Sequence, residues 1–216
     1  MYQGYFFTFE GIDGSGKSTQ VEMLKDYLVK VQGLDSILTR EIGGTRYGDE
    51  LKKVIMKYDA EHFASGNKIS NFTEVMAIMS ARSNHIQKVI LPNIYAGRVV
   101  ICDRFVDSTA AYQSCDGTIT ADMIYRMHDS VFGLWPDLTF LLELNVEVSK
   151  KRLTLRKKND SYDNKNKKYK ELLIEKYRYA ASKYPRIIRI DASKSIAQVH
   201  EEVVKHVKKS MFVILD

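Results

Sequence analysis

The sequence contains little of several residue types that would place it in other classes of protein. Among its 216 residues are only two cysteines and three prolines. Cys102 and Cys115 are too few for a disulfide framework, and neither has the spacing of a metal site. With three prolines and twelve glycines, no linker or low-complexity stretch is long enough to mark a domain boundary. We therefore expect one domain, residues 1–216, with a small appendage.

A long hydrophobic run is also missing. No apolar stretch approaches the length needed to cross a membrane. The first residues lead into an apolar strand without a basic region or a small-residue cleavage site. We expect a soluble, cytoplasmic protein with no membrane partner.

Positive charge is present, but it is concentrated in one segment. The net charge is +6, yet residues 150–170 alone carry +8, because ten lysines and arginines face only Asp160 and Asp163. A body without excess positive charge and one basic segment fit a local anion site better than a general surface for nucleic acid. We expect no nucleic-acid partner, although a solvated lysine-rich loop and helix would explain most of these lysines.

Five short apolar runs have the composition of buried strands. Each is followed by helical or loop sequence, and all are too continuous for surface strands. This alternation predicts a three-layer α/β fold, in which a parallel sheet has helices on both faces. The runs are Tyr5–Glu10, Ser36–Arg40, Val99–Asp103, Leu138–Leu144 and Ile187–Asp191.

The segments between these runs carry helical signals. Asn71–Asn93 has apolar residues at near-helical spacing and is closed by Pro92, and the first helix ends at Gly33. The predicted helices are Ser18–Gln32, Asn71–Asn93, Ala121–Phe132, Val146–Lys157, Lys165–Ser182 and Ile196–Lys209.

A phosphate-binding motif follows the first strand directly. It has the pattern G-x-x-x-x-G-K-[ST] in the strand, loop and helix setting that the P-loop requires. Its glycines let backbone N–H groups point inward, toward an anion at the helix N-terminus. We expect Lys17 to reach the outer phosphates and Ser18 to ligate Mg²⁺. The predicted nucleotide-binding residues are Gly11, Ile12, Asp13, Gly14, Ser15, Gly16, Lys17, Ser18 and Thr19.

A P-loop alone does not separate a GTPase, an ATPase motor and a small kinase. No N-K-x-D guanine signature is present, and Asn159-Asp160 does not supply one. Asp103 ends the third apolar run and Arg104 follows it, at the sheet edge where open parallel sheets bind ligands. Asp103 could hold Mg²⁺ or its waters, and Arg104 could clamp a phosphate with its forked donors. A strand-end salt bridge would explain the same pair.

Four further motifs make the sequence resemble the thymidylate kinase family over nearly its whole length. They correspond to the family's TREPGGT loop, its acceptor-side helix, its DR-x-x-x-S-x-x-AYQ element and the entry to its fourth strand. In this sequence they are Thr39 to Thr45, Glu74 to Arg82, Asp103-Arg104 with Ser108 and Tyr112-Gln113, and Pro136 to Thr139.

The resemblance implies a fold and an activity. The fold would be a P-loop NTPase fold with a five-stranded core, a small mobile lid at about residues 150–170, and a homodimeric assembly. The activity would be transfer of the γ-phosphoryl group of ATP to dTMP, with Mg²⁺, giving dTDP and ADP. Small-molecule nucleotides would be the partners.

The resemblance also assigns roles at the acceptor site. Asp13 would bond the deoxyribose 3′-hydroxyl near the reacting phosphates, and Arg104 would hold the dTMP phosphate. Tyr112 would pack against the sugar where a ribose 2′-hydroxyl would otherwise sit, which favours deoxyribose. The base contacts would come from Arg82 and Gln113, completed by Thr109 or Ser108.

Three positions depart from the family pattern. Ile42 replaces the loop proline, and because a non-proline cis peptide costs about 2.5 to 4 kcal/mol, this replacement argues against any cis bond that the family uses there. Ile78 replaces the phenylalanine that the family stacks on thymine, so an apolar surface remains without aromatic stacking. Lys52 stands where many bacterial relatives direct an arginine toward the dTMP phosphate, so a point charge replaces a fork.

The catalytic arginine is expected from the lid. Gly14 follows the acidic P-loop residue, as in the family members that supply this arginine from the lid. Arg156 matches the first lid arginine, whereas Ser161 aligns with the second and has Lys157 and Lys158 nearby. The predicted catalytic residues are Asp13, Lys17, Arg104 and Arg156.

Three other functions stay open. A kinase for dUMP, dCMP or a deoxynucleoside fits the same motifs. Ile78 favours this alternative, because the aromatic residue that the family stacks on thymine is missing. A P-loop protein that binds nucleic acid through the basic segment would show salt-dependent DNA binding without phosphoryl transfer. A regulatory nucleotide switch would not need the acceptor pocket that Asp13, Arg82, Arg104 and Tyr112 are expected to build.

Overall fold

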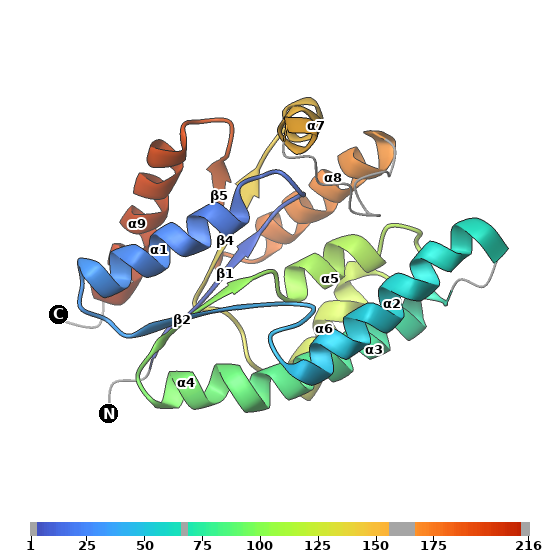
Figure 1. Cartoon of the computed structure of the whole chain (residues 1–216), viewed down its shortest axis with the longest axis horizontal. Coiled ribbons are helices and arrows are strands. Elements are labelled where there is room, and N and C mark those ends of the chain that lie inside the picture. Colours follow the sequence, from blue (N-terminus) through green and yellow to red (C-terminus); the bar gives the residue numbers. More distant parts are fainter. Residues whose placement is uncertain (1–3, 66–68, 156–166, 213–216) are drawn as a thin grey trace.

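A parallel sheet of five strands lies at the centre of the molecule (Figure 1). The computed structural model describes residues 4–65, 69–155 and 167–212. The strand order is β2-β3-β1-β4-β5, and every neighbouring pair is parallel. The strands are β1 (Phe6–Glu10), β2 (Ser36–Arg40), β3 (Val99–Asp103), β4 (Leu138–Glu143) and β5 (Ile187–Asp191). The predicted strands are confirmed, and two of them are one residue shorter than expected.

The predicted helical segments are also present. They are α1 (Lys17–Lys30), α3 (Asn71–His85), a π-helical turn η1 (Ile86–Ile90), α4 (Leu91–Tyr95), α6 (Ala121–Val131), α7 (Val146–Leu155), α8 (Lys167–Lys183) and α9 (Ile196–Phe212). The predicted end of α7 and start of α8 fall within residues 156–166, outside the described part of the chain.

Helices cover both faces of the sheet, as the three-layer prediction requires (Figure 1). On one face α1 and α9 pack against the strands, and residues such as Phe7, Leu24 and Val203 form the core there. On the other face the core includes Phe6 and Ile90, under the helices from α3 to α6 and α8. In the described part of the chain no helix is long and apolar enough to cross a membrane.

Two helices were missed by the sequence reasoning, α2 (Arg46–Ser65) and α5 (Val106–Gln113). From Arg46 to Tyr58, only Gly48 and Ile55 of α2 are buried, so the helix has almost no apolar stripe. In α5 the opposite holds, because polar residues such as Asp107 and Gln113 are buried beside apolar ones. Neither pattern shows the one-sided apolar period on which helix prediction depends.

Pro92 does not close the helix as expected. The chain passes through η1, where the Leu91 N–H donates to the carbonyl of Ile86, five residues earlier, and continues into α4. Pro92 is the second residue of α4, directly after the π-helical turn, so its missing N–H falls where the regular α-helical hydrogen-bond pattern is already interrupted. The helical path therefore extends to Tyr95.

The loop after β2 gives a second correction. The peptide bond between Glu41 and Ile42 is cis, although Ile42 stands in place of the family's proline. The sequence argument against a cis bond at this position was wrong.

Candidate active site

The P-loop lies between β1 and α1, at the carboxyl edge of the sheet. Gly11 has φ 133°, and a Cβ there would lie 2.6 Å from the carbonyl oxygen of Leu142 on the neighbouring strand. Gly16 has φ 99° and precedes α1, and a Cβ there would meet nothing within 4 Å. The first glycine allows close backbone packing, and the second leaves the N-terminus of α1 open to an anion.

Lys17 is buried inside this loop. Its Nζ donates to the carbonyl oxygens of Gly11 at 3.0 Å and Ile12 at 3.2 Å. Burial, together with the nearby charge of Arg104, lowers the pKa of the ammonium group. The side chain is thus held in the concavity where the outer phosphates of a P-loop nucleotide bind.

Ser18 and Asp103 meet at the mouth of the loop and offer oxygen ligands. The Ser18 hydroxyl donates to Asp103 Oδ2 at 3.1 Å, and Asp103 Oδ1 is buried without a hydrogen-bond partner among the described residues. A hydroxyl and an unsatisfied carboxylate oxygen beside a phosphate site suit Mg²⁺, which prefers oxygen ligands and keeps several waters. The two predicted metal residues therefore fit the ion.

Arg104 occupies the turn between β3 and α5. Its φ is 70°, in the left-handed region, and its guanidinium group forms an ion pair with Asp13. The Cζ atom lies 5.3 Å from the centre of the Tyr112 ring. Burial acts to raise the pKa of Asp13, but the charges of Arg104 and Lys17 outweigh it and lower the pKa below its usual value. Asp13 is therefore ionised at neutral pH.

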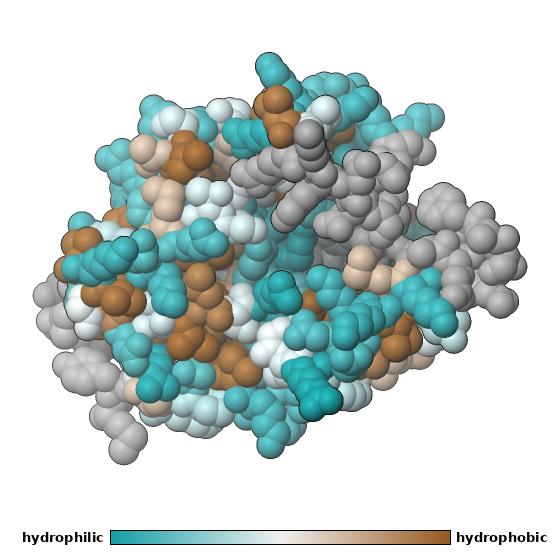
Figure 2. Space-filling model, in the orientation of Figure 1, coloured by the Kyte–Doolittle hydropathy of each residue, from teal (hydrophilic) through white to brown (hydrophobic). Residues whose placement is uncertain are grey.

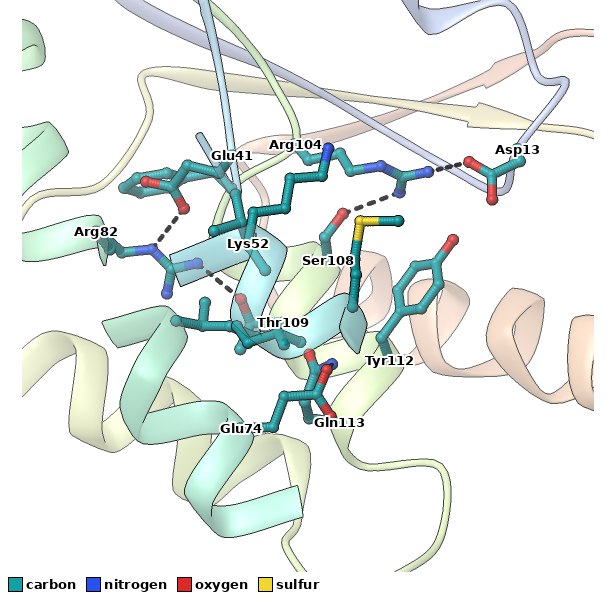
Figure 3. A pocket seen from close by; sticks show the side chains of 15 residues that line it. Asp13, Glu41, Lys52, Glu74, Arg82, Arg104, Ser108, Thr109, Tyr112 and Gln113 are labelled. Atoms are coloured by element: carbon teal, nitrogen blue, oxygen red, sulfur yellow. Dashed lines mark hydrogen bonds and ion pairs between the residues drawn. The ribbon is translucent and has the colours of Figure 1, made fainter. Parts of the chain in front are cut away.

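A cavity of about 230 Å³ opens beside Arg104 (Figure 3). All nine residues predicted for the acceptor side line it, together with six that were not predicted. The predicted residues are Asp13, Lys52, Ile78, Arg82, Arg104, Ser108, Thr109, Tyr112 and Gln113, and the others are Glu41, Ile42, Ile55, Met56, Glu74 and Phe105. In the space-filling view, hydrophilic residues line a hollow near the centre of this face (Figure 2).

Arg82 is fixed at one wall of the cavity. The side chain is almost fully buried, with Nε donating to Glu41 Oε2 at 2.8 Å and Nη2 to Thr109 Oγ1 at 2.7 Å (Figure 3). His85 contacts the other oxygen of Glu41 at 3.0 Å and Thr39 at 2.6 Å. The loop after β2 thus orients Arg82, a role the sequence reasoning did not find for Glu41.

Gln113 lies at another wall, against a carboxylate. Its Nε2 donates to Glu74 Oε1 at 3.1 Å, and Figure 3 shows the two side chains together beside Thr109. A carboxylate accepts and cannot donate, so it fixes which end of the amide faces it. The same cavity is therefore lined by a polar group, Arg82, Thr109 and Gln113, and by an apolar group, Ile78 with Ile55 and Met56 of α2.

Glu10 and Tyr177 lie behind Arg104 and were also missed. Glu10 ends β1 and is fully buried, and burial, with the charge of Asp107, raises the pKa of its carboxyl group to about 7. A carboxylate closing an apolar strand was a usable signal in the sequence. Tyr177 comes from α8, and nothing in its sequence context distinguishes it from a core tyrosine.

One predicted catalytic residue, Arg156, lies outside the described part of the chain, as does Ser161. Arg152, four residues before Arg156, is described. Its guanidinium group donates to the carbonyl oxygens of Gly14 at 3.4 Å and Ala192 at 3.0 Å. The last turns of α7 are therefore anchored to the P-loop.

The P-loop, the cation pair Lys17 and Arg104, and a separate polar cavity beside them define a phosphotransferase class, the P-loop kinases of small acceptors. Comparison with known proteins makes this specific. Residues 9–203 match the family model described as thymidylate kinase. The chain therefore belongs to the thymidylate kinase family.

Individual relatives agree with this assignment. A thymidylate kinase of Rickettsia bellii is 36% identical over 207 residues, covering 94% of this chain and 96% of that protein. One of Halothermothrix orenii is 36% identical over 213 residues, covering 95% and 97%. The crystal structure of thymidylate kinase from Ehrlichia chaffeensis superposes with a TM-score of 0.74 at 31% identity, covering 95% and 99%.

Proposed function

We propose that the residues described above carry out transfer of the γ-phosphoryl group of ATP to dTMP, giving dTDP and ADP for dTTP synthesis. The chain is an enzyme of nucleotide biosynthesis, since it belongs to a family of ATP-dependent nucleoside-monophosphate kinases. The observation that carries the residue assignment is the cavity next to the P-loop, which has a cation at its phosphate end and a polar wall at its far end.

On the donor side, the backbone from Gly11 to Thr19 binds the ATP phosphates, and Lys17 contacts the outer ones. Ser18 and Asp103 hold Mg²⁺ directly or through its waters. When bound, the ion would neutralise negative charge on the outer phosphates of ATP. Arg156 acts on the transferring group from the lid.

On the acceptor side, Arg104 holds the dTMP phosphate and Asp13 accepts the 3′-hydroxyl hydrogen bond. Lys52 adds charge at the phosphate end, and Tyr112 packs against the sugar. The attacking group is an anionic phosphate oxygen, so the reaction needs positioning and charge neutralisation more than a strong base. A lid over the site would exclude water and limit ATP hydrolysis.

The base is bound by Arg82, Thr109 or Ser108, and Gln113 on the polar side. Thymine and uracil present a carbonyl oxygen and an N3–H along one edge, whereas cytosine presents an amino group and an unprotonated N3. Arg82 donates and Gln113 can accept through its carbonyl oxygen, so this wall suits the first pattern. The preference for thymine is a proposal because Ile78 offers no aromatic face.

Ile78→Phe tests this departure. Base–aromatic stacking contributes about 1 to 3 kcal/mol, so the variant is expected to lower KM for dTMP by about tenfold. The KM for ATP should stay unchanged, since Ile78 lines only the acceptor cavity. Steady-state kinetics measure both constants. An increase in KM for dTMP would mean that Ile55 and Met56 leave no room for the ring.

The assignment itself is tested by ADP formation from Mg-ATP with dTMP, dUMP, dCMP and thymidine as acceptors. We expect the highest kcat/KM with dTMP and the lowest with thymidine, which lacks the phosphate for Arg104. A higher value for dUMP, dCMP or thymidine would identify a kinase for that acceptor. Salt-dependent DNA binding without ADP formation would instead support a nucleic-acid protein.

The assembly is proposed to be a homodimer in the cytoplasm, built from a single domain with a lid at about residues 150–170. An apolar groove of about 660 Å³ lies between α3 and α6. It is flanked by exposed apolar side chains that a partner surface would cover. These are Phe72, Met76, Met123 and Val131. Light scattering at twice the mass of one chain is expected, and a single-chain mass would contradict the dimer.

A further inference from the structure

Glu10 has no part in the mechanism above, yet its carboxylate is the most heavily hydrogen-bonded group behind the site. Oε1 accepts from the backbone N–H groups of Phe105 at 2.7 Å and Ser108 at 3.2 Å. Oε2 accepts from the Ser108 hydroxyl at 2.5 Å and the Tyr177 hydroxyl at 3.2 Å. Four donors, from the β3–α5 turn, α5 and α8, thus converge on one buried carboxylate.

The two hydroxyls lie between Glu10 and Arg104. Arg104 Nη1 is 3.2 Å from the Ser108 oxygen and 3.3 Å from the Tyr177 oxygen. A guanidinium group only donates and Glu10 in its ionised form only accepts, while each hydroxyl has a single hydrogen. The assignment that satisfies all four contacts to the two charged groups has both hydroxyls donating to Glu10 and accepting from Arg104. The contact between the two hydroxyl oxygens, at 2.9 Å, then carries no hydrogen. The two hydroxyls therefore bridge an indirect ion pair.

This bridge determines how Arg104 is presented. Nη1 is engaged by the two hydroxyls and by the Gly11 carbonyl oxygen at 3.1 Å, whereas Nη2 is directed to Asp13 at the cavity. Glu10 also anchors the backbone just after Arg104, which has a left-handed conformation. The Glu10 carboxylate thus contacts both the backbone turn that carries Arg104 and the two hydroxyls that accept hydrogen bonds from the Arg104 guanidinium group.

We propose that Glu10 is a positioning residue for the acceptor-phosphate arginine, acting on Arg104 through the hydroxyls of Ser108 and Tyr177. The proposal rests on the assignment of Arg104 to the acceptor phosphate. It makes Tyr177, in α8, part of the acceptor site without contact to the substrate. Preorganised donors lower the cost of ordering the site when the acceptor binds.

Tyr177→Phe isolates the bridge, because it removes one hydroxyl and keeps the buried ring. We expect the KM and the calorimetric Kd for dTMP to rise about tenfold, as for loss of one hydrogen bond to a charged group. The KM for Mg-ATP should stay within about twofold, since the P-loop contacts are untouched. A merely structural role would lower thermal stability and weaken both substrates together, which would overturn the proposal.

Tyr179→Phe is the matched control. Tyr179 is on the same helix, but its side chain is 40% exposed and its hydroxyl donates to Asp122 at 3.0 Å, away from Arg104. Both KM values should stay within about twofold of the wild type. A rise in KM for dTMP as large as that of Tyr177→Phe would overturn the proposal.

Coupling to Glu10 is measured by combining Tyr177→Phe with Glu10→Gln. If the hydroxyl acts through Glu10, its removal should change KM for dTMP by less than about twofold in the Glu10→Gln background. Independent, multiplicative effects would contradict the bridge. If Glu10→Gln does not fold, combining Ser108→Ala with Tyr177→Phe tests the same hydrogen-bonded bridge, and coupled effects are expected.

A wild type that forms no ADP with dTMP refutes the proposed function, whereas an active wild type with an unaffected Tyr177→Phe variant refutes only this inference.

Discussion

Arg156→Ala is expected to lower turnover by about three to five orders of magnitude while ATP still binds, since this is the contribution of an arginine that stabilises a transferring phosphoryl group. Two other arginines near the P-loop already have partners in the described part of the chain. Arg104 pairs with Asp13, and Arg152 donates to the carbonyl oxygens of Gly14 and Ala192. Arg156 follows directly on α7, whose end these contacts anchor to the P-loop.

The measurement is single-turnover and steady-state ADP formation, with ATP binding followed by calorimetry. Lys151→Ala is a suitable control, because Lys151 is exposed on α7 and its loss changes the charge of the segment equally. We expect it to retain near-normal turnover. Near-normal turnover of Arg156→Ala would exclude Arg156 as the residue that stabilises the transferring phosphoryl group. Lys157 and Lys158 would then be the next candidates for that role.

Arg104→Ala is expected to lower kcat/KM for dTMP by about two to three orders of magnitude, comparable to loss of a preorganised donor at a reacting group. The same substitution leaves Asp13 without its ion-pair partner, so the 3′-hydroxyl contact is weakened as well. The KM for Mg-ATP should change much less. Kinetics with varied dTMP at saturating Mg-ATP, and the reverse, separate the two effects.

Arg104→Lys distinguishes charge from geometry. A lysine restores the positive charge but cannot reach Asp13 and the two bridging hydroxyls with a fork, so only part of the activity should return. Arg98→Ala is the matched control, because Arg98 is 45% exposed in its side chain, pairs with Asp35 and lies at the opposite end of β3. Full activity of Arg104→Lys would show that charge alone suffices.

The sequence predicted the elements whose signals are local. The five strands are continuous apolar runs, and the P-loop is one contiguous motif, so neighbouring residues carry the whole signal. The helices α2 and α5 were missed because burial on them follows their packing partners and not a one-sided apolar period. The expectation that Pro92 closes the helix was wrong for a similar reason, since the helical path around it, through η1, overrides the local preference of one residue.

The residue types of the site, and the family to which they belong, were readable from the linear sequence, because a P-loop and a DR element need their residues at set spacings. How those residues are held was decided only by the tertiary structure. Glu41 reaches Arg82 across 41 positions, Glu74 reaches Gln113 across 39, and Tyr177 reaches Arg104 across 73. Such pairs leave no periodic trace, since they join helices to one another or to the loops after strands that are far apart in the chain. Local motifs therefore specify which reactive residue types are present, whereas the orientation of each side chain depends on the distant element that packs behind it.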